Sequence, residues 1–388
     1  MEQPTAKKKK DTLQKTLHIR VKDKHARVLL NLARQVNQVF NYCNELSSRA
    51  IRERQQWMSS YDLQKYTAGF SKCDDVLIGS QTVQLVCDEY ATRRKQFKKT
   101  RLNWRVSNQK STKYSLGWIP FKSKQIKYVQ GQIHFAGFKF GLWDSYGLAD
   151  YKICAGNFSE DSRGRWYFNA VVDVIDRADI QPSNNQKSAG IDLGLKDCAT
   201  TSDGDKLHGR WYRELEKKLA TAQRAGKKNR ARAIHAKIKN RRADDMHKFS
   251  TQLVKENGAI FVGNVASAAM IKTKMAKSTL DAGWSKLKTM LEYKSRQAGV
   301  VFQVVNERYS TQTCSCCWVI PDSSPKGRAG LGIREWKCSN CGAVHDRDVN
   351  SARVILALGL GRLVGGSKRK SHSVCGPVTV TVQGIPGL

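Results

Sequence analysis

Acidic residues are scarce in this chain. Its 388 residues include 33 Asp and Glu against 68 Lys and Arg, which gives a formal net charge of +35. A compact protein with this excess repels itself, so the composition indicates a polyanionic partner such as nucleic acid. A basic binding protein of the ribosomal or histone type, with no chemistry of its own, would have a similar composition.

Long apolar runs are also missing. No segment approaches the roughly 20 consecutive apolar residues that cross a bilayer, so no membrane partner is expected. The N-terminus is basic at Lys7 to Lys10 and no apolar stretch follows, which argues against a secretory signal. Apart from a cluster near the C-terminus, the eleven cysteines are scattered, as in a protein of a reducing compartment. We therefore expect a cytoplasmic protein.

The first half of the chain has strand patterns at both ends and a helical pattern between them. Apolar and polar residues alternate near the start and again in later segments rich in aromatic residues and glycine. Between these regions, apolar residues recur at steps of three and four. We predict a basic leader over residues 1–12, a β-barrel over 13–23 and 110–180, and a helical insertion over 24–109.

The second half begins at Ser188 and mixes strands with helices. The predicted order is strand, hairpin, helix, strand, helix, strand, helix, which is typical of α/β proteins. We predict a mixed sheet of the ribonuclease H type over residues 188–313 and 342–360. A zinc ribbon over residues 314–341 would be inserted before the last helix, and a flexible tail over 361–388 would follow.

Four cysteines near the C-terminus have metal-binding spacing. Cys314 and Cys317 form one Cys-x-x-Cys pair, and Cys338 and Cys341 form the next. In a reducing compartment this layout predicts one tetrahedral Zn²⁺ site on two knuckles. Because thiolates fill all four positions, we expect the site to be closed and structural.

Three further side chains are expected around this ribbon. Trp318 and Trp336 are predicted to cover it. His345 is predicted to be a surface residue beside it, with no catalytic role.

Two aspartates stand in places that need an explanation. Asp192 lies in an apolar strand between Gly190 and Gly194, where a carboxylate costs free energy unless it is paired or binds a cation. Asp348 lies in the first turn of the apolar helix that follows the ribbon. Each is a candidate Mg²⁺ ligand. The alternatives are a strand-edge Asp bonded to a turn and an acid that complements the helix dipole, although Asp346 suits the helix cap better.

Together these segments resemble TnpB, the transposon-encoded RNA-guided DNA nuclease that is ancestral to the compact type V CRISPR effectors. The specific match extends over residues 188–358, and it lies on Gly190–Gly194, Leu291–Lys294, Ser310–Cys314, the ribbon and Asp346–Ala352. The N-terminal half matches only in layout, as a wedge-like β-barrel with a helical recognition insertion. The resemblance implies a RuvC-like nuclease domain, a guide RNA made from the transposon end, and cleavage of double-stranded DNA beside a short flanking motif. It also implies a nucleoid-associated protein of a prokaryote.

By this resemblance Asp192 is the first catalytic carboxylate and Asp348 the third. The second is missing, because the Glu-Asp that is usual in the family is replaced by Gly263-Asn264, and neither residue supplies an anionic ligand. Two explanations are open. The protein could be a nuclease-inactive, repressor-like binder that still uses a guide, or a glutamate from another segment could take the vacant place.

We favour Glu307 as that glutamate. In a ribonuclease H sheet, the strand after the vacant position is parallel and adjacent, so its carboxyl end opens onto the same metal site. Glu307 follows that strand, and Glu292, one helix earlier, is the alternative. Asp192 would then bridge two Mg²⁺ ions, while Glu307 and Asp348 would each complete one of them.

Basic helix segments are candidates for phosphate contacts, with a solvated helix face as the alternative. The total charge favours contacts, and the residues concerned are Arg93, Arg94, Lys98, Lys227, Lys228, Arg230 and Arg232. We expect one protein monomer per guide RNA. A DNA-strand transferase is not expected, because the sequence has no His-x-His motif with a partner Tyr.

Overall fold

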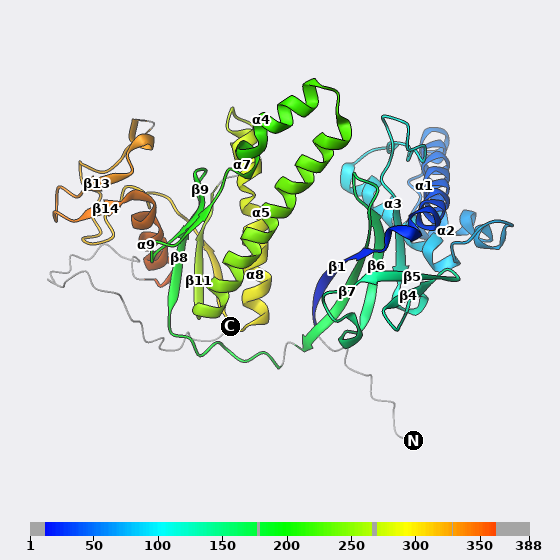
Figure 1. Ribbon diagram of the computed structural model, residues 1–388, viewed down its shortest axis with the longest axis horizontal. Coiled ribbons are helices and arrows are strands. Elements are labelled where there is room, and N and C mark those ends of the chain that lie inside the picture. The colour runs from blue at the N-terminus through cyan, green and yellow to red at the C-terminus, as the bar shows by residue number, and fades with distance from the viewer. Residues whose placement is uncertain (1–11, 177–178, 266–269, 328, 362–388) are drawn as a thin grey trace, which may run out of the picture. The chain divides into compact units, whose positions relative to one another are not determined.

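The computed structural model describes residues 12–176, 179–265, 270–327 and 329–361 (Figure 1). The predicted leader and tail therefore lie outside the described residues, apart from Thr12 and Gly361. Internal contacts divide the chain into two units, Met1–Ala178 and Asp179–Leu388. Within the described part of the chain, no helix is both long and apolar enough to cross a membrane.

The first unit contains an antiparallel sheet with the strand order β2-β6-β7-β1-β5-β4-β3. Its strands are β1 (Thr12–Val21), β2 (Trp118–Lys122), β3 (Lys127–Val129), β4 (Gln132–Phe135), β5 (Phe138–Trp143), β6 (Ile153–Glu160) and β7 (Trp166–Asp176). Since β2 and β3 are its two edges, the sheet is open over the described residues, where the sequence had predicted a barrel.

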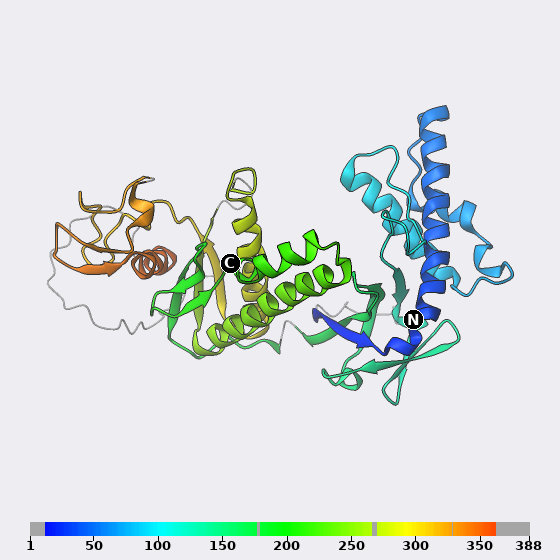
Figure 2. The ribbon, with the colours of Figure 1, turned by 45° about the horizontal axis from the view of Figure 1, so that its top comes forward.

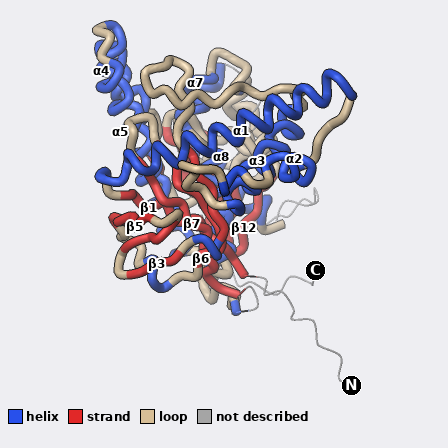
Figure 3. The backbone as a smooth tube through the Cα atoms, turned by 90° about the vertical axis from the view of Figure 1, so that its right-hand side faces the viewer, coloured by secondary structure: helices blue, strands red, loops and turns tan. Residues whose placement is uncertain are grey.

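Helices separate the first strand of this sheet from the others, as predicted. They are α1 (Ala26–Arg54), α2 (Ser60–Thr67) and α3 (Ser80–Phe97), which Figure 3 shows grouped as helical segments. Leu17 and Ile19 alternate with exposed residues along β1 and share one core with Leu32 of α1 and Val86 of α3. The two-residue period of the strand and the helical period of the insertion therefore meet in one hydrophobic core.

The second unit contains a mixed sheet with the order β10-β9-β8-β11-β12. The strands β8, β11 and β12 are parallel, and β9 and β10 form an antiparallel extension. These strands are β8 (Ser188–Asp192), β9 (Asp197–Thr201), β10 (Lys206–His208), β11 (Ala259–Gly263) and β12 (Val301–Val305). The order of elements agrees with the α/β pattern of the sequence.

Helices cover both faces of this second sheet. They are α4 (Trp211–Arg224), α5 (Lys228–Glu256), α7 (Ala276–Ala282), α8 (Trp284–Gln297) and α9 (Arg347–Gly359), and Figure 2 shows α4 and α5 as a long paired hairpin. Ile260 of β11 belongs to the core with α5 and α8, whereas Phe261 packs with Ile355 of α9 on the opposite face. Burial on both faces explains why β11 reads as a continuous apolar run.

The close approach of α9 to the sheet depends on a glycine. A Cβ added at Gly190 would overlap the main chain of α9 at Ala352 and Leu356. Only glycine allows the helix to lie this near to β8. This packing brings the first turns of α9 to the carboxyl end of β8, where Asp192 lies.

Candidate metal centre

The carboxyl ends of three parallel strands meet at one edge of the second sheet. Asp192 ends β8 and Gly263 ends β11, where it pairs with Val305, the last residue of β12. Glu307 follows two residues later. The strand before Glu307 is therefore parallel and adjacent to β11, as predicted from the sequence.

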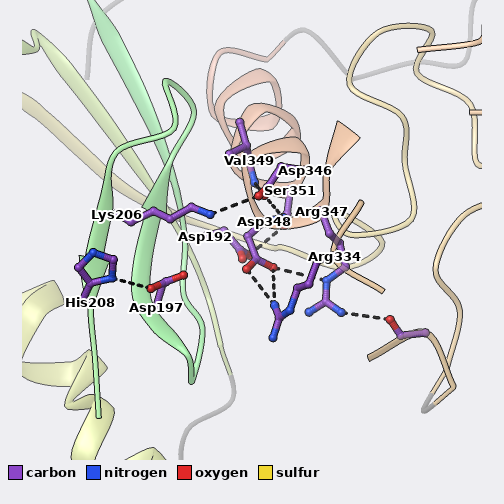
Figure 4. Close-up of polar contacts among 11 residues, drawn as sticks. Asp192, Asp197, Lys206, His208, Arg334, Asp346, Arg347, Asp348, Val349 and Ser351 are labelled. Carbon is purple, nitrogen blue, oxygen red and sulfur yellow. Dashed lines mark hydrogen bonds and ion pairs between the residues drawn. The ribbon is translucent and has the colours of Figure 1, made fainter. Parts of the chain in front are cut away.

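The Asp192 carboxylate lies at the end of β8. Its Oδ1 accepts a hydrogen bond of 2.9 Å from the Ser351 hydroxyl (Figure 4). Burial raises the pKa of Asp192 to about 7, and the negative charges of Asp348 and Glu307 act in the same direction, whereas the Ser351 hydrogen bond and Arg347 act against it. Asp348 and Glu307 thus lie near enough to Asp192 for their charges to act on it.

Glu307 occupies the space that a side chain at position 263 would need. A Cβ added at Gly263 would overlap Oε2 of Glu307. The main-chain N–H of Glu307 donates to Oδ1 of Asn264 at 3.3 Å. Gly263 and Asn264, which stand where the resemblance expects Glu-Asp, therefore both act on Glu307. Gly263 leaves room for its carboxylate, and Asn264 binds its main-chain N–H.

The Glu307 carboxylate also lacks a protein partner for one of its oxygens. Oε2 is buried and has no hydrogen-bond partner among the described residues. Burial raises the pKa of Glu307, and the charge of Lys288 lowers it. A buried carboxylate oxygen left unpaired costs free energy, and a bound cation would remove that cost.

Asp348 and Asp346 divide two roles at the start of α9. Oδ1 of Asp346 accepts hydrogen bonds of 2.9 Å from the main-chain N–H groups of Asp348 and Val349, which confirms the predicted helix cap. The Asp348 carboxylate turns away from this cap. It forms ion pairs with Arg334 at 3.0 Å and with Arg347 at 3.4 Å (Figure 4).

Glu292, the alternative to Glu307, has different surroundings. Its side chain is exposed on α8 and pairs with Arg296 one turn later, at 3.1 Å. A pairing of this kind, four residues apart on an exposed helix face, is common in surface helices. The glutamate whose charge acts on Asp192 is Glu307.

The four predicted cysteines come together in the ribbon. The Sγ atoms of Cys314, Cys317, Cys338 and Cys341 all lie within 4.8 Å of one another. Two Sγ–Sγ distances, Cys314 to Cys341 and Cys317 to Cys338, are 3.7 Å. Sulfurs that share a tetrahedral zinc at about 2.3 Å would lie about 3.8 Å apart, so the spacing suits that ion.

Two expectations about the ribbon are wrong. The strands β13 (Glu335–Lys337) and β14 (Val344–Asp346) pair Trp336 with His345, so both side chains lie on the same face, toward the cysteines. His345 is therefore buried, with Nε2 at 3.0 Å from Sγ of Cys314, and is not a surface residue. Trp336 is buried as predicted, whereas Trp318 is exposed and does not cover the ribbon.

One of the predicted phosphate contacts is also wrong. Arg94 is buried in the first unit, where it donates to Oγ of Ser47 and to the main-chain oxygen of Met58, so it stabilises the helices. The other basic residues of that prediction are exposed: Arg93, Lys98, Lys227, Lys228, Arg230 and Arg232. Arg93 is partly neutralised by an ion pair with Glu89 at 2.6 Å.

The Ser351 hydroxyl is the site residue that sequence reasoning missed. Ser351 lies three residues after Asp348, and a serine at this spacing is not distinctive in a sequence. Its role depends on how close α9 lies to β8. The nearest signal in the sequence is Gly190, which permits that approach.

Comparisons with known proteins agree with the motif assignment. The family described as "Probable transposase" matches residues 170–274, and "Cas12f1-like, TNB domain" matches residues 284–355. A Streptomyces pristinaespiralis protein named "Putative RNA-guided DNA endonuclease" is 37% identical over 218 residues, which are 52% of each chain. The Escherichia coli (strain K12) protein "Putative RNA-guided DNA endonuclease InsQ" is 28% identical over 239 residues, 54% of this chain and 58% of that protein.

The chain thus spans about half the length of the curated relatives it matches. A solved structure, "Cryo-EM structure of the Cas12f1-sgRNA-target DNA complex", aligns at a TM-score of 0.34 and 14% identity, over 89% of this chain and 99% of that one. The family matches and the relatives confirm the resemblance that the motifs of the second half had indicated.

Proposed function

We propose that this chain, whose second half resembles TnpB, is an RNA-guided DNA endonuclease of a transposable element. It would cleave guide-matched double-stranded DNA beside a short flanking motif. The observation that carries the proposal is the Glu307 carboxylate, which lies where a side chain at position 263 would lie and acts on Asp192. The carboxylate that Gly263-Asn264 does not supply would thereby be replaced by one that follows the next parallel strand. The names of the relatives support the same activity.

The proposed domains follow the two units. For the second unit we propose a RuvC-like domain of the ribonuclease H type, over residues 188–313 and 342–360, interrupted by the ribbon. Its three parallel strands, its antiparallel extension and the carboxylates at one sheet edge support this assignment. For the first unit we propose a wedge-type sheet over residues 13–23 and 110–180, which carries a helical recognition insertion over 24–109.

Asp192, Glu307 and Asp348 would hold Mg²⁺ in this site. Carboxylate oxygens are the ligands that Mg²⁺ prefers, and the unpaired Oε2 of Glu307 and the raised pKa of Asp192 both fit a site built for cations. Bound Mg²⁺ would supply an activated water and stabilise the leaving oxygen of the phosphodiester. The protein's part would be to hold three carboxylates at one sheet edge, and Asp348 would exchange its ion pairs with Arg334 and Arg347 for the cation.

The zinc ribbon would act as scaffold. Asn350 of α9 accepts from the main-chain N–H of Ser315 and donates to the oxygen of Thr313, each at 2.8 Å. These bonds tie the helix that carries Asp348 to the first cysteine knuckle. With four thiolates around it, a bound Zn²⁺ has no open position, so its role here is to fix the entry of α9.

Guide and target would be held mainly through their phosphates. The exposed cations at the start of α5, Lys227, Lys228, Arg230 and Arg232, support backbone contacts, as do Arg93 and Lys98 in the first unit. Sequence would be read by pairing between guide and target strands. We propose a guide RNA made from the transposon end, bound by one monomer of the protein.

The decisive experiment is guide-dependent cleavage of a plasmid in Mg²⁺. The protein is purified with the RNA that accompanies it, that RNA is sequenced, and a plasmid that matches it is supplied. We expect wild type and Glu292→Ala to cut the plasmid, and Asp192→Ala and Glu307→Ala to bind it without cutting. Glu292→Ala is the matched control, because it removes an exposed glutamate of the same unit.

Two outcomes would contradict the proposal in different ways. If Glu307→Ala cuts as fast as wild type, Glu307 is not the replacement carboxylate. If wild type binds the matched plasmid with its guide and never cuts it in Mg²⁺, the protein is a nuclease-inactive, repressor-like binder.

A further inference from the structure

We propose that Ser310 and Ser351 form a hydroxyl relay that positions Asp192 for metal binding, an inference that rests on the proposed function. The Ser351 hydroxyl lies 2.9 Å from Oδ1 of Asp192. The Ser310 hydroxyl lies 2.8 Å from that of Ser351. Both are positioning residues, because they act on the metal ligand and not on the reacting atoms.

The chemistry of the three groups fixes the direction of the relay. An ionised carboxylate can only accept, so the single proton of the Ser351 hydroxyl is donated to Asp192. Ser351 must then accept the proton of Ser310. The chain of donation therefore runs from Ser310 through Ser351 to Asp192. Each hydrogen bond polarises the next, so the carboxylate receives a stronger bond than an isolated serine would give.

The relay joins the three segments that carry the candidate ligands. Ser351 lies one helical turn after Asp348 on α9. Ser310 lies in the turn after Glu307, and its main-chain N–H donates to the oxygen of Glu307 at 3.0 Å. The two hydroxyls thus connect the end of β8, the start of α9 and the segment after β12. Moving one of these segments would move the hydrogen bonds that orient Asp192.

The two serine hydroxyls are buried, which limits the orientations that their hydrogen bonds can take. Ser351 is 0% exposed and Ser310 is 2% exposed, so water does not compete for their hydroxyls. The overlap that a Cβ at Gly190 would cause shows that α9 packs directly against the backbone of β8, which brings Ser351 within reach of Asp192. A ligand whose orientation is fixed before the cation arrives loses less conformational freedom on binding it. Partners that orient a metal ligand typically contribute roughly 10- to 100-fold to metal affinity or activity.

The test measures metal binding apart from cleavage. Full-length protein, with its zinc and accompanying RNA, is titrated with Mn²⁺ and the bound ion is followed by electron paramagnetic resonance. Asp192→Asn defines the binding that belongs to the site, as distinct from ions on the RNA. We expect Ser351→Ala to weaken the Asp192-dependent binding by about 10-fold, and Ser310→Ala to weaken it less.

Ser295→Ala is the matched control. Ser295 is also 0% exposed in the second unit, and its hydroxyl has no hydrogen-bond partner among the described residues. Its replacement should leave Mn²⁺ binding at the wild-type level. The zinc content and the unfolding temperature of all three variants should match, which separates a loss of positioning from a loss of structure.

The double variant tests the relay itself. Because Ser310 acts through Ser351, the combination of both alanines should bind Mn²⁺ no more weakly than Ser351→Ala alone. Additive losses, or Mn²⁺ binding by Ser351→Ala equal to that of Ser295→Ala, would refute the relay. If Asp192→Asn leaves wild-type Mn²⁺ binding unchanged, the metal centre itself is absent, and it is the proposed function that fails.

Discussion

At the scale of single residues, the candidate site depends on the residues at two positions, 263 and 307. A glycine has taken the position where the resemblance expects a glutamate, and a glutamate has appeared where its carboxylate reaches the space left free. The sequence could predict this exchange, because parallel neighbouring strands end at the same edge of a sheet. It could not predict the Ser351 bond to Asp192, because that contact depends on a helix-to-strand distance set by packing.

Filling the space at position 263 should therefore stop cleavage without removing any carboxylate. In Gly263→Ala, the new Cβ would displace the flexible end of Glu307, so the fold is kept while the carboxylate leaves its place. We expect plasmid cleavage to fall by about 100-fold or more, in line with the several kcal/mol that metal-ion catalysis contributes. Gly263→Glu combined with Glu307→Ala should recover part of the cleavage, whereas Gly263→Ala combined with Glu307→Ala should not. Wild-type cleavage by Gly263→Ala would contradict the overlap.

The raised pKa of Asp192 predicts a pH-dependent stability of the Mg²⁺-free protein. Its pKa is about 7 in the folded chain and 3.8 in the reference state, so the folded state binds this proton more tightly. The stabilisation is present in full below the lower value and is lost as pH rises through the higher one. Asp192→Asn cannot ionise, so its advantage in unfolding temperature over wild type should grow as pH rises from 5 to 8. Addition of Mg²⁺ should favour wild type; equal pH profiles without the ion would contradict the prediction.

At the scale of elements, the sequence predicted which segments form helices or strands better than it predicted the surroundings of their side chains. Period-two and helical patterns located the strands and helices, because apolar residues face a core in both. The sequence did not reveal whether an individual polar side chain faces the interior or the solvent. Arg94 lies among basic residues at a helix end, but its side chain turns inward to Ser47. His345 was misplaced because the pairing of β13 with β14 turns it toward the cysteines.

Loss of a proposed zinc ligand should affect the proposed metal centre at Asp192 through α9. In Cys338→Ser, the knuckles lose a thiolate, and the bonds of Asn350 to Thr313 and Ser315 lose their support. We expect zinc content and cleavage to fall together, while the accompanying RNA stays bound. Cys316→Ser, beside the first knuckle but outside the four-sulfur cluster, should keep both zinc and activity. Cleavage by zinc-free Cys338→Ser would show that the ribbon does not hold Asp348 in place.

At the scale of the whole molecule, the net charge of +35 indicates a partner that carries many negative charges along its length. The exposed basic residues at the start of α5 are one identifiable part of that surface. Composition could predict a polyanion but not which cations face it, because exposure and ion pairing decide that.

Replacing Lys227, Lys228, Arg230 and Arg232 together by alanine should weaken RNA binding and lessen its salt dependence. Each lost phosphate contact should reduce the slope of log affinity against log salt by about 0.7 for single-stranded RNA. Filter binding over a range of NaCl concentrations measures the slope. Lys248→Ala is the control on the same helix, because Lys248 is paired with Asp244 at 2.8 Å. An unchanged slope in the fourfold variant would place the RNA elsewhere.

The shared space between positions 263 and 307 also constrains how such a site can be inherited. Two carboxylates cannot occupy it at once, so glutamate at both positions would displace one of them. A lineage that moved its ligand from one strand to the next would pass through a form with no carboxylate there, or through one in which two compete. Under the proposed function, the first of these intermediates would bind guide-matched DNA without cutting it. Descendants that regained cleavage should carry glutamate at one position or the other, with glycine at 263 whenever 307 is acidic.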